Sequence, residues 1–437
     1  MTPLFWIAFF FIILNVVYIV VGAFSARGIG RSLEAYLVAK RGLGNWITIL
    51  GLMATWFSAY MFLGLYGASY RTGLGPFVQG YILIACSVSF LLLGIPTWFL
   101  GKKYGYMSSA DFLSDRYESR YVGLLQGLAW IIFTMAMLMV NMIGAGALLH
   151  GLTNGVIPFW VGVVAITIIM LSYLIPGGTR SMAWVDALQG IILLTFLWIS
   201  FYILFQAAGG NMVEIVNKFV GTAEEKLLTI PGLVPQWTYG VWFFQGVFGL
   251  TWGAFPHMYI RWYAARSPKV IIIATLITAA LGPLIFWHGA WGGPIARVIE
   301  PGLTGAATDS VLPILIARIA SPLFIGLLFA GAFAAIMSTT SSMAMGVSAI
   351  GTRDIYRAFI NPEATENQAV TASRISLTLF LLLGMILSFS QPQFLMTLGM
   401  LFLPGDYNLV RSFMVLFTGH GLISTVLMPG LLLVLFY

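Results

Sequence analysis

The chain has 437 residues, of which 60% are hydrophobic and only 8% are charged. A soluble domain averages about a quarter charged residues, so this composition excludes a water-facing surface over most of the chain. A helix needs about 20 mostly apolar residues to cross a bilayer, and uncharged stretches of that length recur along the sequence. We therefore predict an all-α polytopic membrane protein with a single membrane domain over residues 1–437.

The membrane spans are expected in the following order. Residues 3–24 lack a preceding cluster of positive charge and exceed the apolar region of a signal peptide, so we interpret them as a retained helix. Nine further spans are expected at residues 46–70, 77–100, 121–149, 156–175, 187–208, 237–260, 270–295, 319–350 and 375–390. Residues 412–437 form a possible C-terminal helix, which gives about 11–12 transmembrane helices.

The basic residues indicate how these spans are oriented. With the N-terminus outside, 15 of the 21 Lys and Arg residues fall in inner connections, among them Arg180 and Arg261, and five fall in outer ones. The positive-inside rule therefore predicts a multi-pass protein of the plasma (inner) membrane with an outer N-terminus. Contact with anionic lipid explains the net charge of +7 without any nucleic acid. Two long outer connections, residues 209–236 and 293–318, are candidate extracellular lids.

Glycine-interrupted segments open two halves of the chain. Residues 54–64 precede one set of five helices, and residues 245–253 precede a second set. Inverted-repeat transporters use such broken helices to free backbone groups for ligand binding. Five plus five helices after an extra N-terminal helix is the count that this fold requires, with the repeats at residues 46–208 and 237–417. Close helix packing is the alternative explanation of these glycines.

Hydroxyl side chains cluster in the span expected at residues 319–350. Ser338, Thr339, Ser341 and Ser342 lie within two helical turns. Hydroxyl oxygens together with freed carbonyl oxygens suit a hard cation such as sodium. The alternative is that these side chains join helices or bond to carbonyls of their own helix.

Asp186 is expected near the inner end of a membrane helix. An acidic group in that position is expensive and usually functional, which favours an ion-binding role. An interfacial carboxylate paired with Arg180 is the alternative, and Asp186 could also take a proton in a proton-coupled carrier. The four histidines are scattered and no Walker-type loop is present, so catalytic residues, bound organic cofactors and nucleotide hydrolysis are not expected.

Several stretches resemble the sodium:solute symporter family. They are residues 54–67, 177–189 (Gly-Gly-Thr-Arg-Ser-Met-Ala-Trp-Val-Asp-Ala-Leu-Gln), 334–342 followed by 353–356 (Arg-Asp-Ile-Tyr), and 261–266 (Arg-Trp-Tyr-Ala-Ala-Arg). The resemblance covers roughly residues 5–390 and fades after residue 390. It implies the five-plus-five inverted-repeat fold of amino-acid/sodium symporters and sodium-coupled import of a small organic solute by alternating access. A transporter-like solute sensor is the alternative from another functional class.

The resemblance also implies the ligands of the coupling ion, Na⁺. A main sodium site is expected from the carbonyls of Ala54, Phe57 and Ala335 and the hydroxyls of Ser338 and Thr339. Some family members bind a second sodium ion through an aspartate and serines, and Asp186, Ser338, Ser341 and Ser342 match those positions. Two sodium ions per cycle are therefore expected.

The solute pocket is expected at Trp56, Tyr60, Met61 and Trp252, on the interrupted helices. The proline-type members of the family resemble this region but carry an aspartate where Trp56 stands, and the sugar transporters carry a glutamine where Met61 stands. The Trp-Phe-Ser stretch at residues 56–58 looks most like the pantothenate and monocarboxylate branch. A small carboxylate is therefore the expected solute.

Overall fold

The computed structural model describes residues 2–27, 32–56, 59–153, 155–230, 232–233 and 239–389, and the structural statements below refer to these residues. The expected C-terminal helix at residues 412–437 and the end of the second expected repeat lie outside them. The described chain is helical, apart from loops and one isolated bridge between Leu43 and Ala265. The all-α prediction is confirmed.

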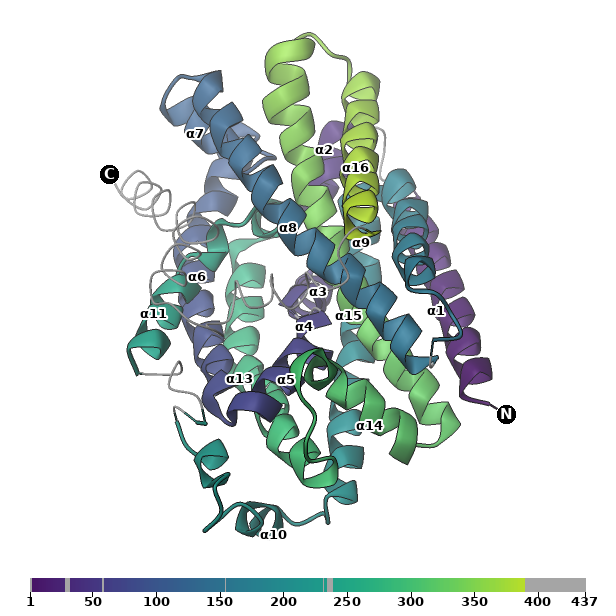
Figure 1. The fold of residues 1–437 in the computed structure, drawn as a ribbon. Helices are drawn as coiled ribbons and strands as arrows, with labels where there is room; N and C mark the ends of the chain where they lie inside the picture. The colour runs from purple at the N-terminus through teal and green to yellow at the C-terminus, as the bar shows by residue number, and fades with distance from the viewer. Residues whose placement is uncertain are drawn as a thin grey trace.

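Figure 1 shows the arrangement of the helices. In chain order they are α1 (Pro3–Ala26), α2 (Leu33–Val38), α3 (Asn45–Trp56), α4 (Ala59–Phe62), α5 (Gly64–Thr72), α6 (Val78–Tyr104), α7 (Asp111–Arg116), α8 (Arg120–Leu152), α9 (Phe159–Ala207), α10 (Met212–Asn217), α11 (Tyr239–Gly249), α12 (Pro256–Ala264), α13 (Pro268–Ile299), α14 (Val311–Ile319), α15 (Pro322–Ile350) and α16 (Glu366–Phe389). Two short 3₁₀ turns, η4 (Trp252–Ala254) and η5 (Gly305–Ser310), and a π-helical extension of α15, η6 (Gly351–Ile360), matter below.

Seven helices of the described chain are long and apolar enough to cross a membrane, whereas ten spans were expected there. Part of the difference lies in α9, which joins the two spans expected at 156–175 and 187–208. Its 49 residues pass through Gly178, whose φ of 52° is a conformation that glycine adopts without strain. The helix therefore changes direction at Gly178.

The remaining difference comes from two broken helices. In the first half the described chain leaves the α-helix at Leu63, between α4 and α5, within the expected interruption at residues 54–64. In the second half, α11 ends at Gly249 and α12 begins at Pro256. Proline suits the first position of a helix because its missing N–H would have had no partner there. Both interruptions expected from the sequence are therefore found.

Helix α15 lies at the centre of the bundle, against α1, α3, α8 and α9 (Figure 1). Every residue from 328 to 350 is buried. α1 packs closely on α9, where the Ser181 hydroxyl donates to the carbonyl of Gly22 at 2.6 Å. The hydroxyl cluster of α15 contacts α3 and α9.

Candidate functional site

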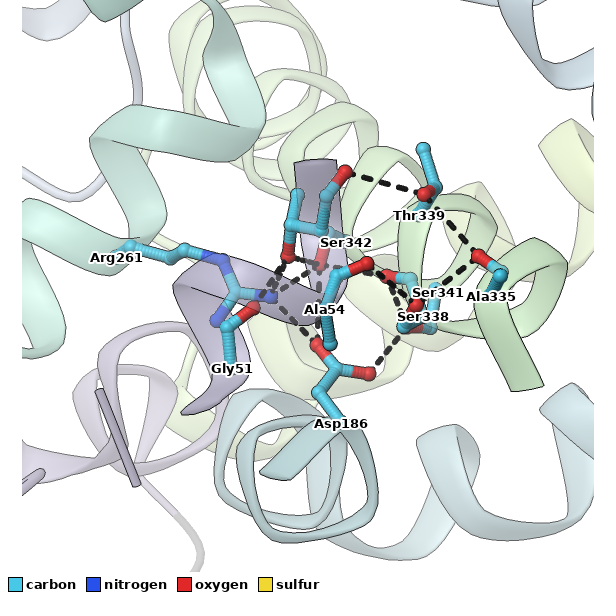
Figure 2. Close-up of polar contacts among 10 residues, drawn as sticks. Gly51, Ala54, Asp186, Arg261, Ala335, Ser338, Thr339, Ser341 and Ser342 are labelled. Atoms are coloured by element: carbon cyan, nitrogen blue, oxygen red, sulfur yellow. Dashed lines mark hydrogen bonds and ion pairs between the residues drawn. The ribbon is translucent and has the colours of Figure 1, made fainter. Parts of the chain in front are cut away.

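The end of α3 meets the hydroxyl cluster of α15 (Figure 2). The Ser338 hydroxyl donates to the carbonyl oxygen of Ala54 at 2.8 Å and to that of Ala335 at 3.0 Å. The Thr339 hydroxyl donates to the carbonyl of Thr55 at 3.1 Å and to that of Ala335 at 3.2 Å. Four of the five residues expected at the main sodium site are thus brought together, and Phe57 lies outside the described residues.

The carbonyl oxygens of Ala54 and Thr55, near the end of α3, accept from hydroxyls of α15. The cluster presents only uncharged oxygen atoms, and it is fully buried. Such a set of oxygens suits a monovalent hard cation in a broken-helix transporter.

Asp186 of α9 lies beside the same cluster. Its side chain is 0% exposed, and it accepts from the Ser341 hydroxyl on Oδ1 at 3.0 Å and from the Ser342 hydroxyl on Oδ2 at 3.2 Å. Asp186, Ser341 and Ser342, three of the four residues expected at a second sodium site, are therefore in direct contact. Ser341 and Ser342 also donate to the carbonyl oxygen of Ser338, one turn earlier in α15.

Arg261 of α12 completes this group, so the prediction of an inner-loop position for this residue is wrong. Its guanidinium is 2% exposed and lies 2.6 Å from Oδ2 of Asp186. The same nitrogen, Nη2, donates to the Ser342 hydroxyl at 2.7 Å and to the hydroxyl of Thr55. Arg261, and not Arg180, is therefore the ionic partner of Asp186. A buried carboxylate needs a buried cation, which is the signal that could have identified it.

Gly51 provides the space for this guanidinium. A Cβ atom at position 51 would lie 2.7 Å from Nη1 of Arg261 and 3.8 Å from the carbonyl oxygen of Ala183. Any larger residue in this turn of α3 would therefore displace the arginine side chain. The sequence alone gave no reason to include Gly51 or Thr55 in the site.

The residues expected at the solute pocket are only partly brought together. The rings of Trp56 and Trp252 lie 4.8 Å apart between centroids, and Trp56 also contacts Phe90 at 5.4 Å. Met61 is fully buried and belongs to the hydrophobic core. The side chain of Tyr60 lies outside the described part of the structure. An aromatic group therefore joins the first broken helix to the second.

The segment η5 is attached to the end of α5 by an ion pair. Arg71 Nη1 lies 2.7 Å from Oδ1 of Asp309 and also donates to the Thr308 hydroxyl. Burial raises the pKa of the Asp309 carboxyl, and the nearby Arg71 opposes that rise. A second ion pair joins Arg297 to Glu224 at 2.5 Å, linking the two connections expected to be lids.

The fold and the oxygen cluster on a broken helix together define a secondary transporter. The structure shares its fold with a Na⁺-coupled sialic acid symporter solved in a substrate-bound outward-open state. The two agree with a TM-score of 0.76 at 18% identity, over 91% of this chain and 86% of the other. The predicted fold class is confirmed.

Comparison of sequences identifies the family. The profile of the sodium:solute symporter family matches residues 36–404. A sodium/pantothenate symporter of Escherichia coli (strain K12) is 29% identical over 87% of this chain and 78% of its own length. A monocarboxylic acid transporter of Corynebacterium glutamicum is 27% identical over 77% of this chain and 65% of its own length.

The chain belongs to the sodium:solute symporter family, as the sequence analysis expected. It is a multi-pass transporter of the plasma membrane, and it is not an enzyme. Sodium is its coupling ion, and its solute is a small molecule.

Proposed function

We propose that this chain imports a small organic carboxylate together with sodium. The main sodium ion binds the carbonyl oxygens of Ala54, Phe57 and Ala335 and the hydroxyls of Ser338 and Thr339. The observation that carries this proposal is that both hydroxyls contact the carbonyls at the end of α3. These contacts join two helices through oxygen atoms that a sodium ion also requires.

Such a site links sodium binding to the shape of the transporter. A ligand shifts a conformational equilibrium only by its differential affinity for the two states. A sodium ion held by α3 and α15 together favours the state in which these helices are in contact. Solute then binds beside the ion, near Trp56 and Trp252. Entry of sodium down its gradient supplies about 2.3 kcal/mol per charge per 100 mV.

The proposal of a carboxylate is supported by the names of two relatives, a sodium/pantothenate symporter and a monocarboxylic acid transporter. Pantothenate and monocarboxylic acids both carry a carboxylate. The broken second helix gives physical support, because α12 begins at Pro256 close to Trp252. In broken-helix transporters the N-termini of half-helices face anionic groups of the substrate.

Three further points belong to this proposal. Asp186, Ser341 and Ser342 provide a second sodium site, since a carboxylate and two hydroxyls meet there. The N-terminus lies outside, as the distribution of Lys and Arg favours. The pocket includes Tyr60 and Met61 of α4, which follow Trp56 along the first broken helix.

The test is solute-stimulated uptake of radioactive sodium into proteoliposomes, with short monocarboxylates, pantothenate and amino acids as candidate solutes. The Ser338→Ala, Thr339→Ala double variant is expected to lose this uptake. Thr340→Ala is the matched control, because the neighbouring Thr340 hydroxyl donates to Ile336 of its own helix at 2.6 Å. It is expected to transport normally.

Other outcomes would replace the proposal. Uptake driven by a proton gradient without sodium would indicate a proton-coupled carrier. Solute binding without any ion flux would indicate a sensor. Coupled uptake of amino acids, with carboxylates and pantothenate inactive, would keep the symporter but contradict the solute class.

A further inference from the structure

Arg261 stands at a place where a second cation would be expected. Its Nη2 contacts Oδ2 of Asp186 and the hydroxyl of Ser342, and both groups belong to the proposed second sodium site. A sodium ion bound there would need the same oxygen atoms. The guanidinium and the ion are both monovalent cations, so each satisfies the charge of the carboxylate.

One nitrogen of this guanidinium connects four helices. Arg261 belongs to α12, and its Nη2 reaches Thr55 on α3, Asp186 on α9 and Ser342 on α15. Figure 2 shows the guanidinium of Arg261 pointing towards Asp186 and Ser342. The helix that carries Arg261 follows the second break of the bundle, so movement of α12 would withdraw the arginine from the three others.

The connection extends to the main sodium site through Thr55. The hydroxyl of Thr55 accepts from Arg261, while its carbonyl oxygen accepts from the Thr339 hydroxyl at 3.1 Å. The Thr55 hydroxyl also lies 3.3 Å from the Ser342 hydroxyl. Release of Arg261 therefore changes the contacts of a residue that belongs to both groups.

We propose that Arg261 is a built-in cation that competes with a second sodium ion for Asp186. While the guanidinium is in place, the protein binds one sodium ion, at the main site. The second ion binds only when Arg261 withdraws, so this arginine sets how many ions the transporter holds. Arg261 is thus a positioning residue for coupling. This inference rests on the proposed function, since it requires that sodium binds at Ser338 and Thr339.

A purely structural ion pair would behave differently. Removing one partner of a buried pair lowers stability because a charge is left without compensation. It would not by itself create a new ion site. The number of bound sodium ions therefore separates competition from simple stabilisation.

The experiment is equilibrium binding of radioactive sodium to the purified full-length protein, without solute. The wild type is expected to bind one ion, with a second only at concentrations at least about tenfold higher. Arg261→Gln is expected to bind two sodium ions over the range of sodium concentration in which the wild type binds one. Adding Asp186→Asn to this variant should return the count to one. Arg266→Gln, at an exposed position two residues beyond the end of α12, is the matched control and should bind like the wild type.

Arg261→Lys keeps the charge on a shorter side chain and should keep the count at one. A count of one in Arg261→Gln at every concentration, or two ions of equal affinity in the wild type, would overturn the inference. If Arg261→Gln does not fold, two ions of equal affinity in the wild type would still overturn the inference, and Gly51→Ala provides a second variant in which the second ion should bind more tightly. Failure of the proposed function would give a different result. The wild type and the Ser338→Ala, Thr339→Ala variant would then bind the same amount of sodium.

Discussion

The Ser338 hydroxyl on α15 donates to the carbonyl oxygen of Ala54 on α3 at 2.8 Å, across 284 residues of sequence. This contact joins the centre of the bundle to the end of a broken helix. It also brings together two oxygen atoms of the proposed main sodium site. Stability and ion binding therefore depend on the same pair of residues.

Ser338→Ala is expected to abolish the stabilisation of the protein by sodium. A ligand that binds only the folded state at about 100 times its Kd adds about 2.7 kcal/mol to the free energy of unfolding. The wild type should thus show a rise in Tm on addition of sodium that Ser338→Ala lacks. Thr340→Ala should keep the rise. An equal rise in Tm for all three proteins would contradict the role of Ser338.

Gly51→Ala is expected to weaken the Asp186–Arg261 contact without unfolding the protein. The added Cβ would lie 2.7 Å from Nη1 of Arg261, and the far end of that flexible side chain is what must move. We expect tighter binding of the second sodium ion, in the same direction as for Arg261→Gln but smaller. Sodium titration of the purified protein measures this.

Gly44→Ala serves as the control for Gly51→Ala, since a Cβ there meets no atom within 4 Å. It should leave sodium binding unchanged. Unaltered binding in Gly51→Ala would show that the guanidinium has room to move without leaving Asp186.

Apolar runs predicted the long helices because burial in lipid requires them. The span expected at 121–149 corresponds to α8, Arg120–Leu152. Pro176, Gly177 and Gly178 lie between the two spans expected within α9, and such residues normally end a helix. The π-helical extension η6 was not expected, since its charged residues resemble a loop. It is held by a contact distant in sequence, from the Ser108 hydroxyl to Asp354 at 2.8 Å.

The candidate site was also partly predictable from the sequence. Ser338, Thr339, Ser341 and Ser342 form a local pattern within one helix, and Asp186 is conspicuous in an apolar region. Arg261 was missed because charge counting treats an arginine between two spans as a loop residue. Its partner lies 75 positions away, so only the three-dimensional structure, in which α12 packs against α15, shows that the two charges meet.

Gly178→Ala is expected to destabilise the protein by about 1–3 kcal/mol. The residue has a φ of 52°, and an added Cβ would also collide with the carbonyl oxygen of Tyr36. A lower Tm and a lower yield of folded protein should result. Sodium affinity of the folded fraction should be unchanged, because Gly178 does not contact the ion site in the described structure.

Gly151→Ala in α8 is the control for Gly178→Ala. A Cβ at position 151 meets no atom within 4 Å, and alanine favours helix more than glycine does. Its Tm should be equal to or above that of the wild type. A Tm of Gly178→Ala equal to that of the wild type would show that the bend in α9 does not depend on glycine.

Arg71→Gln is expected to make the attachment of η5 more strongly dependent on pH. Burial raises the pKa of Asp309 and Arg71 opposes the rise, so loss of the arginine raises this pKa further. A raised pKa in the attached state means that attachment is favoured by protonation. In Arg71→Gln, η5 should therefore remain attached at mildly acidic pH and detach as the pH rises above the raised pKa, and the wild type should show the same trend more weakly.

Cleavage within residues 301–310 by a protease of broad specificity measures this detachment. Cleavage of Arg71→Gln should increase with pH by more than that of the wild type. The Arg71→Gln, Asp309→Asn double variant should lose the extra dependence, because no carboxyl remains to titrate. Arg318→Gln removes an exposed ion pair with Glu300 nearby and should behave like the wild type. Equal cleavage of Arg71→Gln at both pH values would show that Asp309 does not control the attachment of η5.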